Sequence, residues 1–189
     1  MKRGTDMRQR LRRHIVLVGM MGAGKSALGS ELARRLHVPF TDSDHEIEAA
    51  AAMSISEIFA RDGEAFFRDR EAQVIARILK ESPRVISTGG GAWMQERNRA
   101  AIKAAGLSVW LACDLETLWH RVRQRSTRPL LQTADPKGTL ARLLAERDPT
   151  YALAELTFPA RPGDSVDAAT TRLLDAIRAA DPDLVTETP

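Results

Sequence analysis

The sequence contains very little cysteine, since Cys113 is the only one among 189 residues. A disulfide framework is therefore excluded, and a thiol in the apolar run 109–113 is expected to be buried and inert. The chain also lacks any stretch approaching the roughly 18 apolar residues that a membrane-spanning helix needs. The run 15–21 is too short for a secretion signal, because Gly22, Gly24 and Lys25 interrupt it. These absences predict a cytoplasmic protein that contacts no membrane.

The chain also lacks a strong charge of one sign. Its 28 basic and 25 acidic residues give a net charge of +3, and residues 1–13 hold six of the basic ones. The remainder carries 22 basic against 24 acidic residues, which is weak support for a nucleic-acid-binding face. Length and composition predict one domain over residues 14–180, with a flexible basic leader at 1–13 and a flexible tail at 181–189.

Short apolar runs alternate with longer segments of helical periodicity, which is the pattern of βα units and a parallel sheet. Helices are expected at residues 25–36, 54–61, 64–80, 97–105, 115–124, 136–147 and 166–179, and strands at 15–18, 39–41, 85–87, 109–112 and 156–158. The segment 124–136 loses this periodicity and contains Arg125, Arg128 and Pro129, which predicts a mobile loop. The predicted fold class is α/β, with a five-stranded parallel sheet flanked by helices.

Residues 19–26, Gly-Met-Met-Gly-Ala-Gly-Lys-Ser, match the phosphate-binding pattern G-x-x-x-x-G-K-[ST] at every fixed position. A strand precedes the loop and an amphipathic helix follows it, so backbone N–H groups and a helix N-terminus converge on one anion. Lys25 supplies positive charge for the β- and γ-phosphates, and the Ser26 hydroxyl can ligate the Mg²⁺ that accompanies a nucleotide. The competing interpretation is a tight glycine turn between a strand and a helix.

Two carboxylates, Asp42 and Asp44, follow the second expected strand, at the edge where ligands bind in open α/β sheets. One could reach the water shell of a metal, while the other accepts a hydrogen bond or a proton from a substrate hydroxyl. Aspartate is also a favoured helix-capping residue, and a helical segment begins here. The spacing does not decide between the two interpretations.

Three consecutive glycines, residues 89–91, follow the third expected strand. They allow a ligand to press against the main chain, although a plain flexible turn is the alternative. Arg68, Arg128 and Arg147 occupy segments expected at the same edge, and guanidinium groups bind carboxylates and phosphates in two-point geometry. Each arginine alone is better explained as solvated surface charge, so only the set indicates a site.

The sequence resembles the shikimate kinases, small P-loop kinases whose fold is related to that of the nucleoside monophosphate kinases. The resemblance runs from residue 14 to about residue 161. It covers, in family order, the phosphate-binding loop, Asp-Ser-Asp-His-Glu-Ile-Glu (42–48), Ile-Phe-Ala-Arg-Asp-Gly-Glu (58–64), Phe-Arg (67–68), Thr-Gly-Gly-Gly (88–91), Thr-Arg-Pro-Leu-Leu (127–131) and Arg-Asp-Pro-Thr-Tyr (147–151). It implies that ATP, with Mg²⁺, phosphorylates the 3-hydroxyl of shikimate to give shikimate 3-phosphate in aromatic amino-acid biosynthesis.

The resemblance also implies residue roles. Asp44 would act as base toward the attacked hydroxyl, Asp42 would lie near Mg²⁺ through water, and Ser26 would ligate the ion. Arg68 and Arg147 would hold the shikimate carboxylate. The other implied roles are ATP binding by Gly22, Ala23, Gly24, Lys25, Ser26, Ala27 and Arg128, catalysis by Lys25 and by Arg128 in a mobile lid, substrate contacts from Gly90, Gly91, Phe59 and Phe67, and nucleotide contacts from Arg121 and Arg161.

Two other functions stay open at this point. A gluconate or other small-metabolite kinase of the same fold would share the loop and a nearby aspartate, although the triple glycine and the Phe-Arg pair argue against it. A nucleotide-dependent switch or RNA-associated NTPase could use the same loop while its basic leader holds nucleic acid, and the near-neutral body argues against that. We expect a monomer that binds ATP and shikimate and does not bind nucleic acid.

Overall fold

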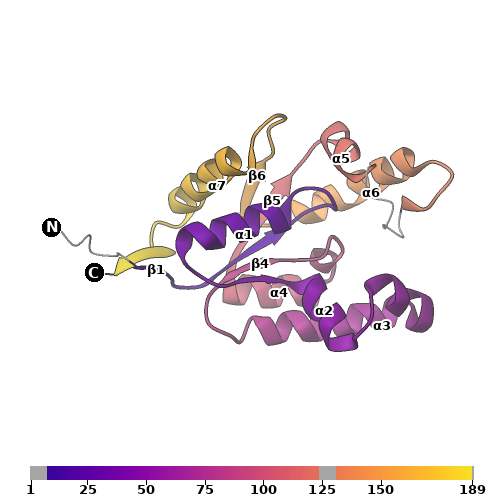
Figure 1. Ribbon diagram of the computed structural model, residues 1–189, viewed down its shortest axis with the longest axis horizontal. Coiled ribbons are helices and arrows are strands. Elements are labelled where there is room, and N and C mark those ends of the chain that lie inside the picture. The colour runs from indigo at the N-terminus through magenta and orange to yellow at the C-terminus, as the bar shows by residue number, and fades with distance from the viewer. Residues whose placement is uncertain (1–7, 124–130, 189) are drawn as a thin grey trace.

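The computed structural model describes residues 8–123 and 131–188 (Figure 1). Its central sheet has five parallel strands: β2 (His14–Val18), β3 (Phe40–Asp42), β4 (Val85–Ser87), β5 (Gly106–Ala112) and β6 (Leu156–Pro159). They are ordered β3-β4-β2-β5-β6 across the sheet. The phosphate-binding loop therefore follows the central strand, and the expected five-stranded α/β fold is confirmed.

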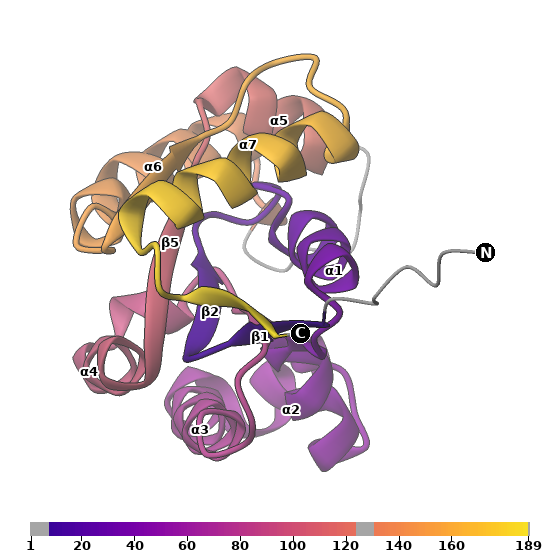
Figure 2. The same cartoon turned by 90° about the vertical axis from the view of Figure 1, so that its left-hand side faces the viewer.

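Helices flank the sheet on both faces (Figure 2). The helix α1 (Lys25–Leu36) packs against α7 (Val166–Ala180) and lies on β3 and β4. The helix α4 (Glu96–Ala105) packs on β5 and contacts α3 (Ile55–Ile78). The remaining helices are α2 (Ser43–Ala51), a short 3-10 helix η1 (Ala92–Met94), α5 (Leu115–Val122) and α6 (Pro136–Tyr151). In the part of the chain that the structure describes, no helix is both long and apolar enough to span a membrane.

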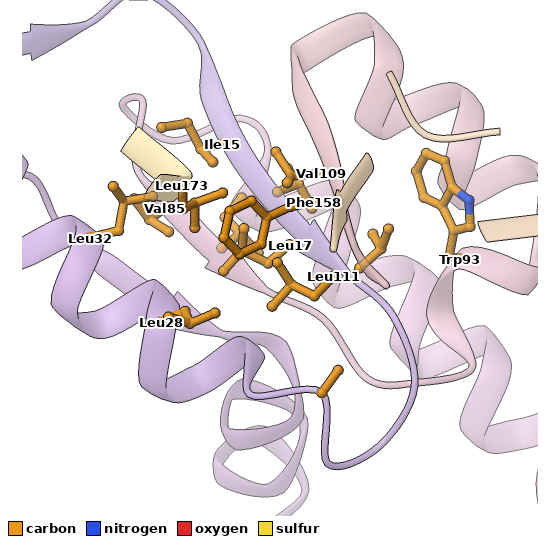
Figure 3. Close-up of a cluster of buried hydrophobic side chains, with 14 of the residues drawn as sticks. Ile15, Leu17, Leu28, Leu32, Val85, Trp93, Val109, Leu111, Phe158 and Leu173 are labelled. Atoms are coloured by element: carbon orange, nitrogen blue, oxygen red, sulfur yellow. The ribbon is translucent and has the colours of Figure 1, made fainter. Parts of the chain in front are cut away.

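The core forms where the apolar stripe of α1 meets the sheet. Leu28 and Leu32 on this helix lie near Leu173 of α7 and Phe158 of β6, beside the buried side chains of β2 (Figure 3). All five residues of β2 are buried. A strand covered by helices on both faces has no solvent side, which explains why residues 15–18 are all apolar and do not alternate.

Two helices, α3 and α6, differ clearly from the sequence prediction. The segments 54–61 and 64–80 form one element, α3, with a kink at Gly63, whose φ of 82° and ψ of 173° are not helical. Glycine adopts this positive φ without the strain that a Cβ would add. The helix α6 continues past Arg147 and through Pro149 to Tyr151. Its last turn is held against η1 by a hydrogen bond of 2.8 Å from Trp93 Nε1 to the Thr150 carbonyl.

Parts of the segments predicted as a leader and a tail form a two-stranded ribbon. Residues Arg8–Leu11 form β1, which pairs antiparallel with β7 (Val185–Thr188). Leu11, the last residue of β1, and Leu184, just before β7, are buried, and the Arg13 guanidinium forms an ion pair of 3.0 Å with Asp181. Apolar burial and charge pairing at the base of the ribbon provide the order that the polar strand sequences do not suggest. Residues 1–7 and 189 lie outside the described residues.

Candidate active site

The phosphate-binding loop connects the carboxyl end of β2 to the first turn of α1. Gly22 has a φ of 80°, and a Cβ on it would lie 2.6 Å from Val122 Cγ1, so no larger residue fits there. The Lys25 ammonium donates hydrogen bonds to the carbonyls of Gly19 and Met20, at 2.8 and 2.9 Å. The lysine charge is thereby held over the loop whose N–H groups would surround a phosphate.

A cavity of about 810 Å³ opens over this loop. It brings together the predicted ATP-binding residues 22–27 with Asp42, Asp44 and Gly90, and it extends past Arg121 to Arg161. The Arg121 guanidinium donates to the carbonyls of Gly22 and Ala23 at 3.2 Å. Most of the residues predicted to bind the nucleotide therefore share one cavity with both aspartates and Gly90. Arg68, Gly91 and Arg147, also predicted for shikimate, do not line it.

Asp42 caps a helix and also contacts the phosphate-binding loop. Its side chain caps α2 by accepting hydrogen bonds from the N–H groups of Asp44 and His45. Its second carboxylate oxygen accepts a hydrogen bond of 2.6 Å from the Ser26 hydroxyl. The cap fixes the carboxylate beside the loop, so capping α2 and facing a bound metal are compatible.

Ser26 and Asp42 supply a hydroxyl and a carboxylate oxygen, which are donors that Mg²⁺ prefers. Within residues 8–123 and 131–188, no group of three or more His, Cys, Asp or Glu side chains could hold a metal by itself. An ion here would need further oxygens from nucleotide phosphates and water, which is the usual form of Mg²⁺ binding in kinases. The two residues therefore fit an ion that arrives with the nucleotide.

The Asp44 carboxylate is positioned to handle a proton. Burial raises its pKa to about 6, and the nearby charge of Asp42 adds to the increase while Lys25 opposes it. Its Oδ1 is buried and has no hydrogen-bond partner among the described residues. A carboxylate with an elevated pKa and an unused acceptor can take a proton from a hydroxyl group.

Two of the three glycines, Gly89 and Gly91, are closely approached by side chains, and none of the three has a positive φ. A Cβ on Gly89 would lie 2.6 Å from Asp44 Oδ1, and a Cβ on Gly91 would lie 2.5 Å from Arg68 Nη1. The glycines therefore let an acid and a guanidinium approach the main chain, together with any ligand between them.

Two of the three predicted arginines meet at this segment. Arg68 lies next to Gly91, and Arg147 Nη1 donates to the Gly90 carbonyl at 3.4 Å. Arg128 and most of the expected mobile loop fall outside the described residues. Phe59 and Phe67 pack on each other at 4.7 Å, in a small core cluster with Ile47 and Ile58, and they do not line the cavity.

Glu71 was not predicted from the sequence. Its carboxylate is 1% exposed and pairs with Arg68 at 2.9 Å. Burial nevertheless raises the pKa of Glu71, against the opposing charge of Arg68. The only sequence signal was the spacing of Glu71 from Arg68, since residues three apart on a helix are neighbours.

Cys113 is half-buried, not buried as expected, and burial raises the pKa of its thiol.

Known proteins share both the sequence and the fold. The family model described as shikimate kinase matches residues 21–178. The shikimate kinase of Cereibacter sphaeroides is 55% identical over 182 residues, covering 96% of this chain and 90% of the relative. That of Ruegeria pomeroyi is 56% identical over 167 residues, covering 88% and 86%.

A solved structure, the shikimate kinase from Acinetobacter baumannii in complex with shikimate, superposes with a TM-score of 0.84 at 39% identity. It covers 89% of this chain and 94% of that one. The residues matched by the family model include positions 21–26 of the phosphate-binding loop, the glycine segment 89–91, Arg68 and Arg147. The chain therefore belongs to the shikimate kinase family.

Proposed function

We propose that this protein transfers the γ-phosphoryl group of ATP to the 3-hydroxyl of shikimate, giving shikimate 3-phosphate and ADP in aromatic amino-acid biosynthesis. The observation that carries the proposal is the arrangement around residues 89–91. A proton acceptor, Asp44, lies on one side of this segment, and two guanidinium groups lie beside the next two glycines. This matches a small acid that presents a hydroxyl at one end and a carboxylate at the other.

Each group then has a task in phosphoryl transfer, which depends mainly on positioning and on neutralising charge. The loop N–H groups and Lys25 hold the β- and γ-phosphates. Asp44 accepts the proton of the attacking hydroxyl. Arg68 and Arg147 hold the shikimate carboxylate, which fixes the ring relative to the phosphate. Ser26 and Asp42 would hold Mg²⁺ together with the nucleotide, and the ion would supply positive charge that neutralises the phosphates.

Several parts of the prediction have no structural counterpart here. Arg128 closing over ATP as part of a lid stays a prediction, as do the monomeric state, the cytoplasmic location and the lack of nucleic-acid binding. The roles given above to individual site residues are likewise proposals, supported by where the side chains lie.

A coupled assay of ADP release tests the function directly. Purified protein with ATP and Mg²⁺ is offered shikimate, gluconate and a set of nucleoside monophosphates, and the product is identified by phosphorus NMR. We expect turnover with shikimate alone and a product phosphorylated at the 3-position. Preferential turnover of gluconate would favour the small-metabolite kinase alternative and overturn the proposal.

A further inference from the structure

The phenol of Tyr151 lies between three parts of the site. Tyr151 is the last residue of α6 and is fully buried. Its hydroxyl donates a hydrogen bond to the Gly90 carbonyl and lies 3.8 Å from the sulfur of Met20 in the phosphate-binding loop. Its ring stacks on Trp110 with centroids 6.1 Å apart. The function proposed above assigns it no part.

The Gly90 carbonyl has two donors from the same helix. Arg147 Nη1 reaches it at 3.4 Å, and the Tyr151 hydroxyl reaches it from one turn further along α6. Residues four apart share a helix face, so the two side chains point to the same acceptor. A tyrosine hydroxyl is protonated at neutral pH and can donate, and burial raises the pKa of Tyr151 further, to about 12.

Fixing this carbonyl also fixes the next N–H group. The described chain has no cis peptide bond, and in a trans peptide the C=O of residue 90 and the N–H of residue 91 point in opposite directions. Bonds that hold the Gly90 carbonyl toward α6 therefore turn the Gly91 N–H away from α6. Within residues 8–123 and 131–188, this N–H has no protein acceptor. The Arg68 guanidinium lies beside the same residue.

We propose that Tyr151 is a positioning residue for the substrate carboxylate, because its hydroxyl holds the Gly90 carbonyl and so orients both Arg147 and the Gly91 N–H. The proposal rests on the function proposed above. Under this proposal, residues of α6 and residues 89–91 together form the pocket for the substrate carboxylate. The contact between α6 and η1 has a separate support in the bond from Trp93 to Thr150, so loss of one hydroxyl should leave the fold in place.

Tyr151→Phe tests the proposal, because it removes the hydroxyl and keeps the stacked ring. The kcat and KM are measured for shikimate and for shikimate methyl ester, whose acid group is neutral, and ADP affinity is measured by calorimetry. We expect kcat/KM for shikimate to fall about 3- to 10-fold, as for loss of one hydrogen bond. The loss should appear in KM, while the ester and ADP are unaffected.

Trp110→Phe is the matched control, since it alters the ring that stacks on Tyr151 and leaves the hydroxyl. The ratio of acid to ester activity should match that of the wild type. An equal loss with acid and ester in Tyr151→Phe would show a general packing role and overturn the proposal, as would no loss at all. If the wild-type protein does not phosphorylate shikimate, the proposed function fails first, and the role of Tyr151 fails with it.

Discussion

Ser26 and Asp42 are joined by a hydrogen bond of 2.6 Å that links the first turn of α1 to the cap of α2. Asp42→Asn should keep an oxygen for capping and lose the charge that faces the metal. We expect its free energy of unfolding to stay close to that of the wild type, while the Mg²⁺ concentration for half-maximal activity rises. Asp42→Ala should lose both the capping oxygen and the charge, so its free energy of unfolding should also fall by about 0.5–2 kcal/mol.

Urea denaturation and a Mg²⁺ titration of both variants separate the two roles. If the asparagine variant shows the wild-type Mg²⁺ dependence, Asp42 is a helix cap only.

Lys25→Met removes the charge aimed at the β- and γ-phosphates. We expect an intact fold and a kcat lower by at least about 10²- to 10³-fold. This is the loss typical of removing one preorganised group that stabilises charge in the transition state. Lys80→Met, at an exposed position just after α3, is the control and should retain full activity. Near-normal turnover by a folded Lys25→Met protein would contradict the assigned role of the loop.

Asp44 should set the acid limb of the pH profile. A base must be ionised to accept a proton, and the pKa of Asp44 is about 6. The kcat/KM for shikimate should therefore rise with pH through about 6 and level off above it. Asp44→Asn should abolish transfer and spare ADP binding, because the phosphate loop is untouched. Full activity in this variant would leave Asp44 with no chemical role.

Arg68 and Arg147 should be required for a substrate that is an acid. Removing either one strands half of a charge-assisted pair, which should cost about 2–5 kcal/mol of shikimate binding. Arg147→Ala is the cleaner variant, because Arg68→Ala also leaves the buried Glu71 without its ion pair. Calorimetric titration of shikimate measures the loss, with exposed Arg70→Ala as the control. Unchanged affinity in both site variants would exclude the carboxylate clamp.

His14 should make the fold sensitive to mild acid. Its side chain is 3% exposed, and burial lowers its pKa below 6.5 in the folded protein. As the pH falls below 6.5, the unfolded chain therefore binds a proton at His14 before the folded protein does. Between 6.5 and the lower pKa of the folded protein, the free energy of unfolding decreases by at most about 1.4 kcal/mol per pH unit. Urea unfolding at pH 7.5 and 5.5 should show a smaller change for His14→Gln than for the wild type, with exposed His45→Gln as the control.

The parts of the fold that the sequence predicted are those with a local signal. The bounds of α1 agree with the prediction, because its apolar stripe starts at the loop lysine and ends at an αL residue, His37. Strand β2 was recognisable because burial on both faces requires an unbroken apolar run. The phosphate-binding loop was clear because few arrangements other than a nucleotide site need its fixed glycines and lysine.

The parts that were not predicted depend on contacts between distant segments. Strands β1 and β7 are short and polar, and only their pairing across almost the whole chain makes them strands. Glu71 resembles any helix glutamate until Arg68 and burial are seen together. The sequence indicated that glycines 89–91 allow close approach. It did not show that Asp44 and Arg68 are the groups that come close.

The ribbon of β1 and β7 determines how the chain would respond to tension. Its outermost pair is Arg8 with Thr188 and its innermost is Leu11 with Val185. A force that pulls residue 8 and residue 188 apart would therefore break the strand pairs one after another from the outer end, and would not shear all of them at once. Only after Leu11 and Leu184 leave their buried positions would force reach β2, whose far end carries the phosphate-binding loop. The ribbon would give way first, and the loop would keep its shape while it did.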